Sequence, residues 1–164
     1  MRKILSLVLC LMMIISCIPA MAEEAEAVKT GLAILPSLSS SKDNAVQANL
    51  AVTAVTVDDN GVITACIIDA IQVKVAIDAT GVITTDLATA FQSKNELGDG
   101  YGMKAISPIG KEWYEQAAAF CAFITGKTLN EAIAIAANPA ETDVIASCTI
   151  STSDYLQLIV KAGL

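Results

Sequence analysis

A hairpin turn at Asp58-Asp59-Asn60-Gly61 constrains the fold of this chain more than any other feature of its sequence. The flanking segments, about 48–57 and 62–68, are rich in β-branched residues that alternate between two faces, as in half-buried strands. Asn-Gly suits a tight hairpin connection because both residues tolerate the positive φ that a type I′ turn requires. The two flanking segments are therefore expected to pair as antiparallel neighbours.

Two further segments carry the β pattern. Residues 29–35 form a candidate first strand that Pro36 ends, and residues 72–77 continue the β character after the hairpin. Gly-Val-Ile-Thr occurs at 61–64 and again at 81–84, which indicates a second turn of the same kind. This repeat is too short to indicate a duplicated domain.

Helical patterns dominate the second half of the chain. A short helix is expected at 86–91 with Asp86 as its cap, and a longer one at about 111–125, where apolar residues recur on one face. A capping box at 128–131 opens a helix that runs to about Ala137, and a last helix is expected at about 153–162. Strands followed by helices predict an α+β domain: a mostly antiparallel sheet from the N-terminal half packed against helices from the C-terminal half.

The first 22 residues have the pattern of a secretory signal peptide. A basic start at Met1-Arg2-Lys3 precedes an apolar run, and Ala20-Met21-Ala22 has the small-x-small form of a cleavage site. The apolar run is shorter than the roughly 20 residues of a membrane span, so no transmembrane segment is expected in the mature chain. Lipidation at Cys17 is the alternative. Both interpretations place the protein outside the cytoplasm of a bacterium, either secreted or periplasmic, or attached to the cell envelope.

Residues 23–164 are expected to form a single domain, with 23–27 as a flexible leader. Without Arg2 and Lys3 this part of the chain has eight Lys residues against 17 acidic ones, and it has no Arg and no His. Nucleic acid is excluded as a partner because its binding depends on basic side chains that neutralise phosphates. The absence of His also removes histidine-based triads and histidine metal sites. A self-contained enzyme is therefore the less favoured class.

Three cysteines remain in the mature chain, Cys66, Cys121 and Cys148. Their odd number and irregular spacing fit neither a disulfide framework nor a zinc motif. Three reduced thiols are favoured over one bridge and one free thiol.

Two aromatic segments allow a ligand-binding interpretation beside a plain structural one. The loop 98–102, with Tyr101 inside it and Lys104 nearby, has the glycines for a close approach to a phosphate, but it is not a Walker motif, and a plain loop is favoured. Trp113 could flank a ligand, although its helical spacing with Phe120 favours a place in the core.

A hydroxyl-rich segment leads into the last predicted helix. Ser151 and Asp154 stand at capping-box spacing, which is the structural interpretation of this segment. The same position, just before a helix N-terminus, is also suited to binding an anion.

This segment resembles the signature of the extracytoplasmic FMN-binding domain family. The signature reads Asp, two free positions, a small or hydroxyl residue, then Gly-Ala-Thr, followed by Ser or Thr and an apolar helix. The matching positions here are, in order, Asp143, Ala146, Ser147, Cys148 and Thr149, with Ser151, Thr152 and the helix 155–162 as the continuation. Ser147-Cys148 stands where the family has Gly-Ala. The hairpin at 59–63 also resembles that of the family.

In that family, the Thr hydroxyl carries FMN as a phosphoester that a separate flavin transferase installs, and the flavin passes electrons in membrane-associated redox chains. The resemblance therefore implies FMN as the cofactor, with a flavin transferase and a membrane redox partner as partners. Thr149 would be the attachment or phosphate-contact residue, and the rest of the implied cofactor site is Asp143, Ser147, Cys148, Ser151 and Thr152. Covalent and noncovalent flavin binding both stay open. The alternative is a noncatalytic cell-envelope domain that keeps the fold, has lost flavin, and binds another ligand or a protein. Ser147-Cys148 is the feature that favours this alternative.

Overall fold

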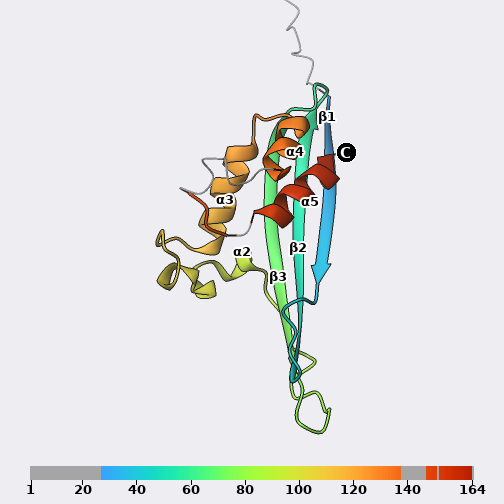
Figure 1. Cartoon of the computed structure of the whole chain (residues 1–164), viewed down its shortest axis with the longest axis vertical. Coiled ribbons are helices and arrows are strands. Elements are labelled where there is room, and N and C mark those ends of the chain that lie inside the picture. The colour runs from blue at the N-terminus through green and yellow to red at the C-terminus, as the bar shows by residue number, and fades with distance from the viewer. Residues whose placement is uncertain (1–26, 138–146, 151, 164) are drawn as a thin grey trace, which may run out of the picture.

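The computed structural model describes residues 27–137, 147–150 and 152–163. The predicted signal peptide, Cys17 and nearly all of the leader lie outside these residues. Three strands form one antiparallel sheet in the order β1-β2-β3, and helices from the later part of the chain pack against it (Figure 1). The elements are β1 (Val28–Ser37), β2 (Ala45–Asp58), β3 (Ile63–Ala76), α2 (Lys94–Leu97), the 3-10 helices η1 (Gly98–Tyr101) and η2 (Met103–Ala105), α3 (Trp113–Ile124), α4 (Leu129–Ala137) and α5 (Ser153–Gly163). The predicted α+β class is confirmed. In the described ranges, no helix combines the length and the apolar character needed to cross a membrane.

The predicted hairpin joins β2 to β3. Asp58 holds its loop, because its Oδ1 accepts hydrogen bonds from the backbone N–H groups of Asn60 and Val62, each at 2.9 Å. Gly61 adopts a φ of 75°, which favours glycine, but Asn60 does not have a positive φ, so the expected type I′ turn does not form. The two β segments predicted at 62–68 and 72–77 form one strand, β3, with Val55 of β2 opposite Cys66.

The repeated Gly-Val-Ile-Thr motif marks a second loop of the same design. Asp78 Oδ1 accepts from the N–H groups of Thr80 at 2.8 Å and Val82 at 2.9 Å, and Gly81 has a φ of 88°. Hydrogen bonds to the Asp78 carboxylate lower its pKa, and the bond from the Thr80 side chain has the largest effect. The repeat is therefore a loop anchored by an aspartate and closed by a glycine, used twice.

The helix predicted at 86–91 is wrong. Asp86 caps a single turn, in which its Oδ1 accepts from Ala88 N at 2.9 Å and its carbonyl accepts from Thr89 N at 3.1 Å. Leu87 is 78% exposed, so this segment has no buried face that would stabilise a helix. The first helix among the described residues is instead α2, which Ser93 and Glu96 open with a capping box.

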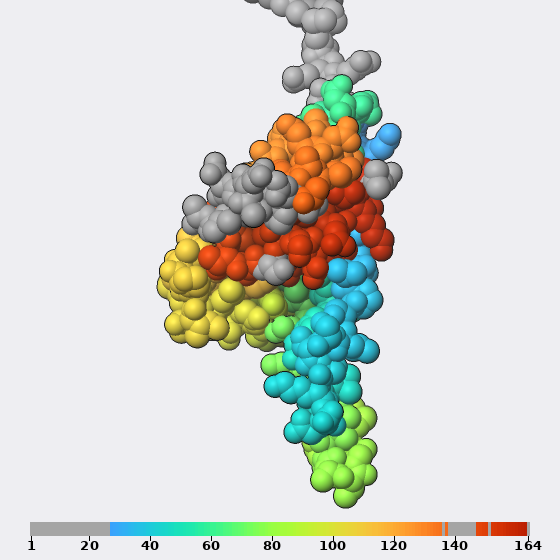
Figure 2. All heavy atoms as spheres, viewed as in Figure 1, coloured from blue at the N-terminus to red at the C-terminus, as the bar shows by residue number. Residues whose placement is uncertain are grey.

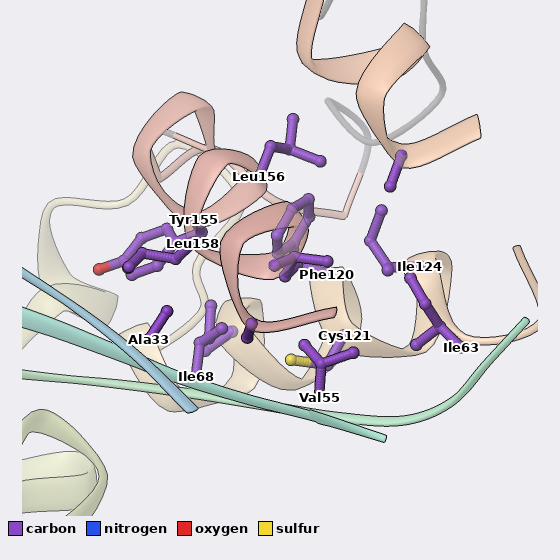
Figure 3. Close-up of a cluster of buried hydrophobic side chains, with 14 of the residues drawn as sticks. Ala33, Val55, Ile63, Ile68, Phe120, Cys121, Ile124, Tyr155, Leu156 and Leu158 are labelled. Atoms are coloured by element: carbon purple, nitrogen blue, oxygen red, sulfur yellow. The ribbon is translucent and has the colours of Figure 1, made fainter. Parts of the chain in front are cut away.

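The helices cover one end of the sheet. α5 packs on β1 and β2, α3 packs on β3, and α4 packs on α5. Figure 3 shows the core between these layers, formed by side chains of the strands, α3 and α5. The buried residues of β2 lie between Thr53 and Val57, and those of β3 lie between Ile63 and Ala70, toward the turn of the hairpin. The far end of the hairpin extends beyond the helices as a narrow arm (Figure 2).

Candidate functional site

Thr149 is exposed to solvent but held firmly in place. Its backbone N–H donates a 2.8 Å hydrogen bond to Gln116 Oε1, and its hydroxyl donates a 3.0 Å hydrogen bond to the same oxygen. Gln116 lies on α3 and has no solvent-exposed surface. The segment before α5 is thus attached to α3 through one amide oxygen.

Both the nitrogen and the oxygen of the Gln116 side-chain amide have hydrogen-bond partners. Its Nε2 donates to Ser107 Oγ at 3.1 Å and to the Lys111 carbonyl at 3.0 Å, while its Oε1 serves Thr149. A buried amide with both donors and its acceptor engaged is a rigid support, because any movement would break several hydrogen bonds at once. Gln116 is not among the site residues predicted from the sequence. Its signal was a single polar residue on the otherwise apolar face of α3.

The neighbours of Thr149 differ in their exposure. Cys148 is 3% exposed, and burial raises the pKa of its thiol. Ser147 and Thr152 are half-buried, and the Thr152 carbonyl accepts from Leu156 N at 2.9 Å in the first turn of α5. The remaining candidates, Asp143 and Ser151, lie outside the described residues. Thr149 therefore presents its side chain at the surface, close in sequence to the start of α5, while Cys148 belongs to the core.

The glycine-containing loop at 98–105 is fixed by a buried carboxylate. Glu112 is 3% exposed and accepts hydrogen bonds from the backbone N–H groups of Met103 at 2.8 Å and Lys104 at 3.0 Å. Gln116 Nε2 also lies 3.9 Å from Met103 Sδ, so the amide that holds Thr149 also contacts this loop. The sequence alone does not reveal this connection.

Lys94 binds the aromatic residues of this region. Its Nζ lies 4.8 Å from the centre of the Tyr101 ring and 5.1 Å from that of Trp113. Trp113 is buried and meets Tyr155 edge to face, with ring centres 6.1 Å apart. The favoured interpretation of Trp113 as a core residue is confirmed.

A groove of about 690 Å³ lies on another flank of α3, between this helix and β3. Successive residues of a helix are rotated by about 100°, which places Gln116 roughly 200° from Tyr114 around α3. Tyr114 borders the groove and Gln116 holds Thr149, so the two features lie on opposite flanks of one helix. The groove is lined by Ala65, Cys66, Ile67, Ile68, Asn95, Tyr114, Ala117, Ala118, Cys121, Ala122 and Thr125. Over the described ranges, no cluster of three or more His, Cys, Asp or Glu side chains could hold a metal ion.

Comparison with known proteins gives one short match. No family model matches the chain, and no solved structure matches it. A chlorophenol reductase of Desulfitobacterium hafniense is 46% identical over 41 residues, which cover 25% of this chain and 12% of that protein. The match thus spans about an eighth of the relative's length. The function of this chain has to be argued from its own residues.

Proposed function

We propose that this protein is an extracytoplasmic flavin-carrying domain that passes electrons in a membrane-associated redox chain, with FMN attached to or held at Thr149. The observation that carries the proposal is that Thr149 is exposed and that its hydroxyl is held in position by the buried Gln116 amide. The short match to a chlorophenol reductase covers too little of either chain to support a substrate.

A modifying enzyme needs a hydroxyl that it can reach, and Thr149 is exposed. Esterification would remove the hydroxyl hydrogen and with it the 3.0 Å bond to Gln116 Oε1. The 2.8 Å bond from the Thr149 N–H to the same oxygen does not involve the hydroxyl. The segment can therefore keep its attachment to α3 after modification.

The surroundings are compatible with a phosphate. α5 begins at Ser153, and the free N–H groups and dipole of a helix N-terminus favour negative charge. Thr152, at the entry to this helix, adds a hydroxyl near that end. When bound, FMN would supply one- and two-electron transfer, while these residues of the chain would hold and orient it.

The departure from the family signature at Ser147-Cys148 is compatible with this role. Cys148 is buried among apolar side chains, where a small thiol substitutes readily for Ala. In the part of the chain that the structure describes, every residue with positive φ is a glycine. Ser147 therefore adopts a backbone conformation that does not require Gly.

The proposal is tested by coexpressing the chain with a flavin transferase and recording its visible spectrum and intact mass after denaturation. We expect a flavin spectrum and a mass increase of one esterified FMN, both lost in Thr149→Ala and both kept in Thr149→Ser. Thr89→Ala is the matched control, because it removes an exposed threonine hydroxyl in the turn that Asp86 caps, outside the proposed site.

An unmodified, colourless chain that binds no FMN on titration would contradict the proposal. That result would favour the noncatalytic cell-envelope domain that has lost flavin. Thr149→Ala retains the backbone hydrogen bond to Gln116, so thermal unfolding can show that the variant is folded.

A further inference from the structure

We infer that Cys66 and Cys121 form a dithiol site that is oxidised to a disulfide by exchange with a disulfide donor, while Cys148 stays a free thiol. The inference is independent of flavin, because the two thiols border the groove on the flank of α3 that faces away from Gln116 and Thr149. All three cysteines are free in the structure.

The fold brings these two cysteines together from different elements. Cys66 lies on β3 and shares its face of the strand with Ile68, which is buried under the helices. Cys121 lies on α3, the helix that packs on β3, and both residues line the same groove. Figure 3 shows Cys121 among the core side chains between α3 and the strands.

The two thiols lie close enough to form a hydrogen bond. The Cys66 thiol donates a hydrogen bond to Cys121, which raises the pKa of Cys66 and lowers that of Cys121. The backbone N–H of Ile68 also points to the Cys121 sulfur and stabilises its thiolate. The thiolate is the nucleophile in disulfide exchange, so a stabilised thiolate at Cys121 favours the reaction.

Access to the site differs between the cysteines. Cys66 is half-buried at the rim of an open groove, whereas Cys148 is 3% exposed and does not line it. The pKa of the Cys148 thiol is raised mainly by burial, and no hydrogen bond to another cysteine contributes to it. A disulfide donor that enters the groove therefore contacts Cys66 and Cys121 but not Cys148.

The reaction balances with a low-molecular-weight disulfide as the oxidant. One protein thiolate attacks a sulfur of the donor and forms a mixed disulfide, which releases the first donor thiol. The second protein thiol then displaces the remaining half of the donor. The protein loses two hydrogens and gains one S–S bond, and the donor becomes two thiols.

The sequence offers a direct readout of the pairing. Trypsin cuts after Lys42, Lys74, Lys111, Lys127 and Lys161, so the three cysteines fall in separate peptides, 43–74, 112–127 and 128–161. The folded mature chain would be treated with oxidised glutathione. The remaining thiols would then be blocked with N-ethylmaleimide in denaturant, so that buried thiols also react, before digestion without reductant.

We expect one blocked thiol per chain instead of three, and a linked pair of peptides 43–74 and 112–127. Cys148→Ser should give the same linked pair, while Cys66→Ser should give none. The oxidised chain should unfold several degrees higher than the reduced one, because the bond closes a long loop between β3 and α3.

Three blocked thiols after oxidation, or a linked pair of peptides 112–127 and 128–161, would overturn the inference. Cys121→Ala provides a second test, since it keeps a small apolar side chain in the core and should also abolish the linked pair. Flavin attachment in Cys66→Ser should equal that of the unchanged chain, so the two proposals can fail separately.

Discussion

Gly31 on β1 lies directly against the backbone carbonyl of Ala162 on α5, so closely that a Cβ added to the glycine would overlap this oxygen. The last turn of α5 can therefore approach the edge strand only because residue 31 has no side chain. The contact joins the first strand of the sheet to the last helix of the chain.

Gly31→Ala should destabilise the fold by about 2 kcal/mol, because the added methyl meets backbone that cannot rotate away. Thermal unfolding should show a fall in Tm of several degrees. Gly100→Ala is the matched control: it adds the same methyl into open space, and its Tm should be almost unchanged. Equal Tm values for the two variants would contradict the close packing of α5 on β1.

Thr53→Val should stabilise the protein by about 1 kcal/mol. Thr53 is fully buried, and its Oγ1 has no hydrogen-bond partner among the residues that the structure describes. Valine fills nearly the same space without an unpaired hydroxyl, and chemical denaturation measures the gain. Thr56→Val is the control, because the Thr56 hydroxyl pairs with that of Thr30 at 2.9 Å and its removal brings no such benefit. A less stable Thr53→Val variant would show that the buried hydroxyl is satisfied in solution.

Gln116→Leu should lower the free energy of unfolding by about 2 kcal/mol, since the N–H of Thr149 and the Lys111 carbonyl lose their partner. Denaturation by urea measures the change. Gln157→Leu, at an exposed position of α5, should have a much smaller effect. If the two variants were equally stable, the Gln116 amide would not be holding the Thr149 segment.

Tyr155 should make the protein less stable above about pH 10. Burial raises the pKa of Tyr155 to about 12, above the value of about 10 for an unfolded tyrosine. The stabilisation is complete below pH 10 and is lost as the pH rises toward 12, because only the unfolded chain releases the proton in this range. Two pH units correspond to about 3 kcal/mol. Urea denaturation at several pH values should show this decline, and Tyr155→Phe should remove the part due to Tyr155. An identical pH profile for Tyr155→Phe would disprove the assignment.

Local patterns predicted much of this fold. The hairpin at Gly61 depends on a turn that its own residues specify, and the capping box of α4 forms as expected, with Glu131 accepting from Thr128 N at 2.7 Å. The apolar face of α3 is buried as its spacing predicted. These features are set by residues close together in the chain.

Features that depend on distant residues were missed. The sequence predicted two β segments, 62–68 and 72–77, where the structure has the single strand β3. Asp69, which lies between them, is disfavoured inside strands, but its Oδ1 accepts from Asn95 N at 3.2 Å, 26 residues later. Gln116 and Thr149 are likewise 33 residues apart. Such contacts become visible only when the strands and helices are placed together.

The arm formed by β2 and β3 has a consequence for how the protein opens. Strands of 14 residues are about 46 Å long, whereas the 11 residues of α5 extend about 16 Å. No arrangement of such a helix could cover the full hairpin. Residues 45–48 and 73–76 lie beyond the end of β1, and none of them is buried, so this end of the hairpin depends on cross-strand hydrogen bonds without a core beneath it. Backbone amides of 45–48 and 73–76 should therefore exchange with deuterium through local fraying, while those of 53–57 and 63–68 exchange only when the whole domain unfolds. The same two strands are thus more stable near their turn than at their far end, and the boundary lies where the packing of the helices ends.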